Sequence, residues 1–190
     1  HMPVNVKDLG ADFLTFSGHK MCGPTGVGVL WGRYDILKDM RPFLGGGEMI
    51  SKVFIDHSTY AEVPQRFEAG TPAIAEAITL GIATDYLTKI GMDAIWQHDV
   101  ELVTYALQRL DEELPEVRTF GPRGDDRGGI IAFTLGNLHA HDLANEKNKK
   151  GIALRAGHHC AQPLHRKLNV PATARASFYL YTTTDDVDCF

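Results

Sequence analysis

A pair of consecutive helical segments constrains the fold of this chain more than any other feature. Residues 73–90 carry apolar side chains at helical spacing, and the pattern ends at Gly91. Residues 93–113 form a second amphipathic pattern directly after it. The chain is therefore divided into a part before this helical pair and a part after it. The apolar positions of the first helix are Ile74, Ile78, Ile82 and Tyr86.

After Pro115 the pattern changes to short strands around a helix. Segments rich in β-branched and aromatic residues predict strands, and residues 142–150 predict a helix between two of them. This alternation favours a small α/β or α+β domain from about residue 90 onward. The predicted strands are residues 117–120, 129–134, 153–155 and 174–180.

Before the helical pair the chain has strands separated by glycine-rich turns. Residues 12–16 predict a buried strand, and residues 27–31 predict a second strand after a Gly/Pro turn. The triple glycine at residues 45–47 predicts a flexible turn, followed by a hairpin arm over residues 49–58.

Composition excludes several classes of protein. The chain has 190 residues, of which 44% are hydrophobic and 23% charged, so intrinsic disorder is excluded. The net charge of -5 and the lack of a basic run argue against nucleic acid as a partner. No apolar run is long enough to span a bilayer. Three cysteines without paired spacing favour a reducing compartment, so we expect a cytoplasmic protein.

Lys20 lies where a predicted buried strand meets a turn, in the sequence Ser17-Gly-His-Lys20. A lysine is rarely buried without a partner. One interpretation is a side chain that reaches solvent from a loop. The other is an amine that forms a Schiff base with a carbonyl cofactor, flanked by Ser17 and His19 as donors for a phosphate.

The segment Arg155-Ala-Gly-His-His-Cys160-Ala-Gln-Pro combines a thiol with several cationic side chains. It is open to three interpretations: a metal site, a nucleophilic cysteine, or an inert thiol. Consecutive ligands and the lack of a second pair argue against zinc. Positive charge from Arg155, His158 and His159 would favour the reactive thiolate form of Cys160.

These motifs resemble those of a known family. Ser17-Gly-His-Lys20, the turn at residues 23–28 and Arg66-Phe-Glu-Ala-Gly-Thr-Pro72 are similar to class V, fold-type I aminotransferase-like enzymes. The Cys160 segment resembles that of the SUF-type (group II) cysteine desulfurases. The resemblance implies an α/β fold: residues 1–88 would be the C-terminal remnant of a large domain that binds pyridoxal 5'-phosphate (PLP). Residues 89–190 would be a small domain carrying the cysteine loop.

The resemblance also implies roles for individual residues. Lys20 would bind PLP with help from Ser17 and His19, and Thr71 would reach the phosphate of a neighbouring subunit's cofactor in a homodimer. Cys160 would attack the sulfur of L-cysteine, which releases alanine and leaves a persulfide for a sulfur-acceptor protein of the SUF system and iron–sulfur cluster assembly.

Two arginines would hold the substrate. An arginine in an otherwise apolar strand needs a carboxylate, and Arg175 matches the residue that binds the substrate's α-carboxylate in this family. Arg155 would be a second polar contact near the thiol. The alternative for Arg175 is an edge-strand side chain that faces solvent, and the alternative for Arg155 is a simple ion-pair partner.

The resemblance covers only the C-terminal part of such an enzyme. Only 19 residues precede Lys20, so we expect the chain by itself to bind PLP poorly and to be slow or inactive. We also expect residues 1–88 to expose an apolar face. Asp185 and Asp186 predict the first turn of a helix, and we expect that last helix to be missing. Two alternatives remain: an inactive interaction module, or a relative of the selenocysteine lyases.

Overall fold

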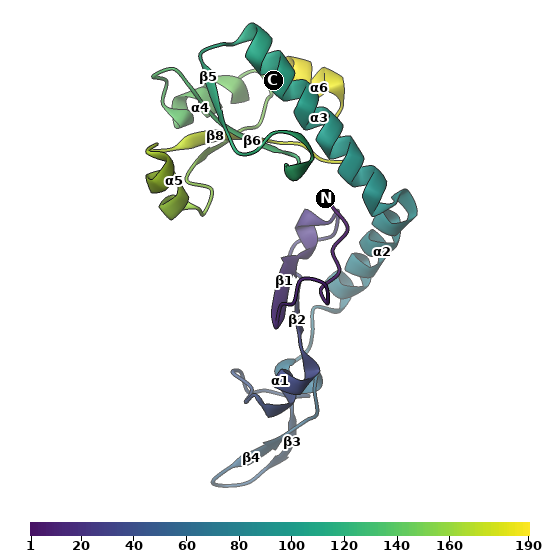
Figure 1. The fold of residues 1–190 in the computed structure, drawn as a ribbon. Helices are drawn as coiled ribbons and strands as arrows, with labels where there is room; N and C mark the ends of the chain where they lie inside the picture. Colours follow the sequence, from purple (N-terminus) through teal and green to yellow (C-terminus); the bar gives the residue numbers. More distant parts are fainter. The chain divides into compact units, whose positions relative to one another are not determined.

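The computed structural model describes residues 1–190, except the side chain of Asp125, and it divides the chain into two compact units (Figure 1). One unit comprises residues 4–90. The other comprises residues 91–190 together with residues 1–3. No helix in the described part of the chain is both long and apolar enough to cross a membrane.

The unit formed mainly by residues 91–190 is a four-stranded antiparallel sheet with helices. Its sheet has the strand order β5-β6-β8-β7, so the last two strands along the chain are exchanged in space. The elements are α3 (Met92–Glu113), β5 (Val117–Phe120), β6 (Ile130–Leu135), α4 (Ala140–Asn148), β7 (Arg155–Gly157), α5 (Gln162–Leu168), β8 (Thr173–Ser177) and α6 (Thr184–Cys189).

One continuous core joins α3, α4 and α6 to the central strands β6 and β8. Ile131 of β6 is completely buried in it, and Leu102 and Leu107 of α3 are 3% and 4% exposed. The amphipathic pattern of residues 93–113 therefore points its apolar positions at the sheet, as such a pattern predicts.

The alternation of β8 explains where the polar residues of this sheet lie. Ala174 and Ala176 belong to the core, so the residues between them project from the opposite face of the sheet. Thr173 and Arg175 therefore share the face that does not meet this core. In the neighbouring strand β7, Arg155 lies directly opposite Arg175, and Gly157 lies opposite Thr173.

Residues 4–90 form two separate two-stranded ribbons and a long helix. The strands β1 and β2 pair with each other, and β3 and β4 form the expected hairpin, with a bulge between Ile50 and Lys52. The elements are β1 (Phe13–Ser17), β2 (Gly28–Gly32), α1 (Tyr34–Asp39), β3 (Ile50–Val53), β4 (Ser58–Tyr60) and α2 (Ile74–Ile90), with one-turn 3₁₀ helices at Gly18–Lys20 and Gln65–Phe67.

The prediction that the first strand is buried is wrong. Phe13 and Phe16 of β1 are 41% and 37% exposed, because the β1–β2 ribbon has no further strands in this chain. The apolar positions of α2 are also exposed, whereas its buried residues are Leu80, Ala83 and Leu87. The expected apolar surface on residues 1–88 is thus confirmed. Its α2 members Ile74, Ile78, Ile82 and Tyr86 are 56%, 64%, 64% and 50% exposed.

The helix start predicted from the acidic pair is confirmed, and the expectation that the last helix is missing stays a prediction. The acidic pair at 185–186 lies in the first turn of α6, a helix of six residues. Thr183 and Asp186 close its start with a reciprocal capping box, in which each side chain accepts a hydrogen bond from the other residue's backbone. Val187 joins the core, so the tertiary structure holds even a helix this short.

Candidate functional site

The Cys160 loop turns sharply between β7 and α5. Gly157 has φ of 122°, a value that only glycine adopts without strain, and it ends the strand. His159 and Cys160 follow with φ of 52° and 62°, which places two consecutive side-chain-bearing residues in the left-handed region. Such backbone persists only where the surroundings enforce it, and it is typical of functional sites. The loop exposes the thiol at its tip.

Two arginines flank this thiol from neighbouring strands. Nη2 of Arg155 lies 3.7 Å from Sγ of Cys160. Arg175 lies directly across the sheet from Arg155, and like charges in opposite positions destabilise a sheet. The buried Nε of Arg175 has no hydrogen-bond partner among the residues that the structure describes. The two guanidinium groups therefore favour the binding of an anion at this position.

The charges acting on Arg175 agree with this picture. Burial and the neighbouring charge of Arg155 lower the pKa of Arg175, while Cys160 opposes that change. A guanidinium stays protonated at any physiological pH, so Arg175 does not lower the energy of its buried charge by losing a proton. A negative charge close to the guanidinium lowers that energy instead. A thiolate and a carboxylate are both suited to this place.

His159 does not supply the positive charge expected from the sequence. Its ring turns inward, with Nε2 3.0 Å from the backbone oxygen of Thr173 and 2.9 Å from the hydroxyl of the same residue. Burial, followed by the charge of Arg175, lowers the pKa of His159 below its usual value, which favours the neutral ring. His158 is exposed, and its ring lies edge-on to that of His165.

Sequence reasoning missed two residues of this region, Thr173 and His165. Thr173 is 1% exposed and His165 is 5% exposed, and the two side chains contact each other. A signal for Thr173 was present, because it lies two residues before Arg175 and so on the same face of a strand. His165 lies four residues after Ala161, which is one helical turn.

The Lys20 corner is a tight turn at the end of β1. Gly18 is buried and its amide donates to the carbonyl of Val27 at 3.0 Å. A Cβ atom at Gly23 would lie 2.8 Å from the carbonyl oxygen of Gly18, so this close approach requires glycine. The turn exposes His19 and Lys20. No hydrogen bond or ion pair engages the Lys20 amine within the described residues, which leaves it available for a covalent bond.

Thr71 lies in the exposed turn that precedes α2. The amide of Gly70 donates to the carbonyl of Gly47 at 3.0 Å, which ties this turn to the triple-glycine segment. Arg66 of the same motif is structural: its guanidinium donates to the carbonyls of Ala61 and Lys38 at 3.0 and 2.6 Å. No hydrogen bond joins Thr71 to the Lys20 corner among the described residues.

The predicted site residues thus form one group in each unit. Cys160, Arg155 and Arg175 gather on one face of the four-stranded sheet. Lys20, Ser17 and His19 share the corner after β1, and Thr71 lies elsewhere in the same unit.

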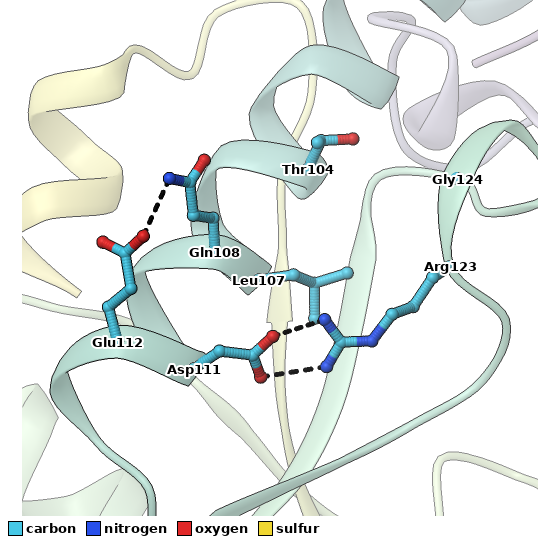
Figure 2. Close-up of a pocket in the computed structure, with 7 residues that line it drawn as sticks. All are labelled: Thr104, Leu107, Gln108, Asp111, Glu112, Arg123 and Gly124. Atoms are coloured by element: carbon cyan, nitrogen blue, oxygen red, sulfur yellow. Dashed lines mark hydrogen bonds and ion pairs between the residues drawn. The ribbon is translucent and has the colours of Figure 1, made fainter.

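A pocket of about 310 Å³ in the larger unit contains none of these residues. It lies between α3 and the connection from β5 to β6 (Figure 2). Both terminal nitrogens of Arg123 donate hydrogen bonds to the Asp111 carboxylate, at 2.5 and 2.9 Å. The hydrogen bonds to Arg123 hold the pKa of that carboxyl below its usual value. Arg123 and Asp111 are therefore paired with each other, and Glu112 accepts a hydrogen bond from Gln108 at 2.9 Å. The lining residues are Thr104, Leu107, Gln108, Asp111, Glu112, Arg123 and Gly124.

Comparison with known proteins places the chain in a family. Residues 1–190 match the family described as Aminotransferase class-V. The chain is 54% identical to a probable cysteine desulfurase of Streptomyces coelicolor, over 99% of this chain and 45% of the relative. It is 52% identical to a cysteine desulfurase of Haloferax volcanii, over 98% of this chain and 43% of the relative. The chain thus spans less than half the length of these relatives.

Solved structures agree with the sequence relatives. The apo cysteine desulfurase of Thermococcus onnurineus NA1 matches with a TM-score of 0.94 and 43% identity, over 99% of this chain and 47% of that one. The cysteine desulfurase CsdA of Escherichia coli, as its S-sulfonic acid, matches with a TM-score of 0.92 and 41% identity, over 100% and 46%. The expected α/β fold of a fold-type I transferase is confirmed, and the chain belongs to the aminotransferase class-V family.

Proposed function

We propose that this chain carries the lysine and the thiol of a PLP-dependent cysteine desulfurase. The observation that carries the proposal is the contact of Arg155 with the sulfur of Cys160 at 3.7 Å, with Arg175 directly opposite on the next strand. This arrangement provides a thiolate nucleophile and an anchor for a carboxylate within one surface. The names of the relatives from Streptomyces coelicolor and Haloferax volcanii support the same reaction.

The Lys20 corner suits PLP. The cofactor's aldehyde requires an amine without a competing partner, and the exposed Lys20 amine meets this requirement. Ser17 and His19 lie on either side of the buried Gly18 and are suited to donate to the phosphate. When bound, PLP withdraws electrons from the substrate and so weakens the bonds next to its α-carbon. In this proposal Thr71 serves the cofactor of a second subunit, so the active protein is a homodimer.

The substrate side of the reaction uses the arginine pair. Arg175 binds the α-carboxylate of L-cysteine, which satisfies its buried Nε. The Cys160 thiolate, held near Arg155, attacks the substrate sulfur. A sulfur–sulfur bond forms and the carbon–sulfur bond breaks, with its electron pair passing to the substrate carbon, which then takes a proton. The products are L-alanine and a persulfide on Cys160, and no external oxidant or reductant is needed.

The persulfide then passes to another protein. We propose a sulfur-acceptor protein of the SUF system as the recipient, and iron–sulfur cluster assembly as the use of the sulfur. The tip position of Cys160 supports such a transfer, because the sulfur is exposed. Three free cysteines support a reducing compartment, for which we propose the cytoplasm.

The test compares this chain with a protein in which the upstream half of the Streptomyces coelicolor relative precedes it. Each is mixed with PLP and L-cysteine, and the mass of an added sulfur atom on Cys160 is measured. We expect the persulfide in the joined protein and little in this chain by itself, because the chain spans only 45% of that relative.

Matched variants assign the reaction to single residues. Cys160→Ser should lose the persulfide, whereas Cys22→Ser and Cys189→Ser, which change the other exposed thiols, should retain it. Lys20→Ala should lose the yellow colour of the bound cofactor. A joined protein that binds PLP but forms no persulfide on Cys160 would contradict the proposed reaction.

A further inference from the structure

The hydroxyl of Thr173 lies between two histidine rings beneath the Cys160 loop. Its oxygen is 2.9 Å from Nε2 of His159 and 3.1 Å from Nε2 of His165. The other ring nitrogen of His165, Nδ1, lies 3.0 Å from the backbone oxygen of Ala161. All these contacts lie in one unit, and Thr173 is 1% exposed. The three side chains form a hydrogen-bonded path that begins at His159 and ends at Ala161, the two residues on either side of Cys160.

The acceptors in this path determine where the protons are. A carbonyl oxygen only accepts, so His165 must donate from Nδ1 to Ala161; in the neutral ring its Nε2 is then an acceptor for the Thr173 hydroxyl. Nε2 of His159 is also 3.0 Å from the carbonyl oxygen of Thr173, so it must carry a proton. The path therefore runs in one direction: His159 donates to Thr173, Thr173 donates to His165, and His165 donates to Ala161.

The ends of the path flank the nucleophile. His159 precedes Cys160 and Ala161 follows it, so hydrogen bonds fix the chain on both sides of the thiol. The carbonyl oxygen of Ala161 also accepts a hydrogen bond from the backbone N–H of His165 at 3.1 Å, so both of its lone pairs are used. The two left-handed residues, His159 and Cys160, need such enforcement because their backbone is strained.

We propose that His159, Thr173 and His165 are positioning residues that hold Cys160 against Arg155 and thereby favour its thiolate. The role of Cys160 as nucleophile rests on the proposed function; the hydrogen-bonded path does not. Arg155 supplies the positive charge next to the sulfur at 3.7 Å, and the hydrogen-bonded path places the residues on either side of Cys160. The titratable and charged groups of the elements around this thiol are Arg155 of β7, Arg175 of β8, His158 and His159 of the loop, and His165 of α5.

The test measures the reactivity of Cys160 without cofactor or substrate. The rate of alkylation by iodoacetamide is followed from pH 5 to 10 by peptide mass spectrometry, with Cys22 and Cys189 as internal reference thiols. Thr173→Val removes the hydroxyl but keeps the shape. We expect its Cys160 to react about fivefold more slowly at pH 7, with the pH midpoint shifted upward, because one charge-assisted contact is loosened.

Two variants serve as controls. Thr173→Ser keeps the hydroxyl and should restore the native pH profile. Thr119→Val makes the same substitution in β5 of the same sheet, where the threonine side chain makes no hydrogen bond to any residue that the structure describes, and it should leave the profile unchanged. A native profile in Thr173→Val, or failure of Thr173→Ser to restore it, would overturn the proposal.

A second measurement needs no variant, so it holds even where Thr173→Val does not fold. Nitrogen NMR of the native chain should find a proton on Nε2 of His159 and a proton on Nδ1 of His165. The opposite tautomer in either ring would overturn the path. Neither experiment involves desulfuration, so a correct path without persulfide formation would count against the proposed function only.

Discussion

The two units of this chain use similar amounts of apolar sequence to different effect. In the unit of residues 91–190, a four-stranded sheet (Figure 1) and three helices enclose a continuous core. Ile131 of this core is 0% exposed. In residues 4–90, two ribbons of two strands each leave most apolar side chains at the surface, and Ile82 is 64% exposed. The difference teaches that hydrophobic periodicity predicts an element and its face, but only neighbouring layers decide whether that face is buried.

The largest expected effect is the loss of folding in one half when the units are separated. A ribbon of two strands is marginal in water, so residues 4–90 by themselves should bind a hydrophobic dye and lack a cooperative transition. Residues 91–190 by themselves should unfold cooperatively in urea. A cooperative transition in the shorter piece, or its absence in the longer one, would remove the contrast between the units.

The same contrast should appear between two isoleucines. Ile131→Ala should lower the free energy of unfolding by about 3 kcal/mol, because it leaves a cavity in a closed core. Ile82→Ala should change it by less than about 0.5 kcal/mol, because the side chain is already exposed. Urea unfolding is followed through Trp96, in a Trp31→Phe background that removes the signal of the other unit. Equal losses would mean that Ile82 is buried in solution.

Asp99 is a third test, because it is a carboxyl group inside the better-packed unit. Burial raises its pKa to about 6, and its Oδ2 contacts Nδ1 of His1 at 2.5 Å. An unfolded aspartate has a pKa of about 3.9. The folded state therefore binds more protons between these values, and its stability falls as the pH rises through this window.

Asp99→Asn should consequently stabilise the protein more at pH 8 than at pH 5, by about 1.4 kcal/mol. The measurement is urea unfolding at both pH values, again through Trp96. Glu101→Gln, on the exposed part of the same helix, is the matched control and should show no such difference. A pH-independent effect of Asp99→Asn would mean that the carboxyl group is hydrated.

The smallest effect concerns the capping box of α6. Thr183→Ala removes the side chain that accepts from the Asp186 amide at 3.2 Å and should cost about 1 kcal/mol. Thr183→Ser retains the acceptor and should cost much less. Thermal unfolding of both variants checks this. If the alanine variant is as stable as the serine variant, the core contact of Val187 holds the helix without its cap.

Local patterns predicted most of the elements. Residues 117–120 form a strand with the predicted bounds, and the long helix before Gly91 begins at Ile74, one residue later than predicted. The predicted strand at 174–180 is observed at Thr173–Ser177, because it runs only as far as β6 and β7 provide partners. The short strand β7 begins at Arg155, where the prediction ended, because its extent depends on pairing with β8.

The candidate site likewise has features that the sequence predicted and features that only the structure revealed. By itself the sequence determined the motifs around Lys20 and Cys160, because these are residue types at short spacing, and the resemblance of these motifs to a known family implied the family and the fold class. Only the tertiary structure decided that Arg155 lies opposite Arg175, that His159 is turned inward, and that Thr173 and His165 contact the Cys160 loop. The physical reason is register: these contacts join strands and a helix brought together by long-range pairing, which no local pattern encodes.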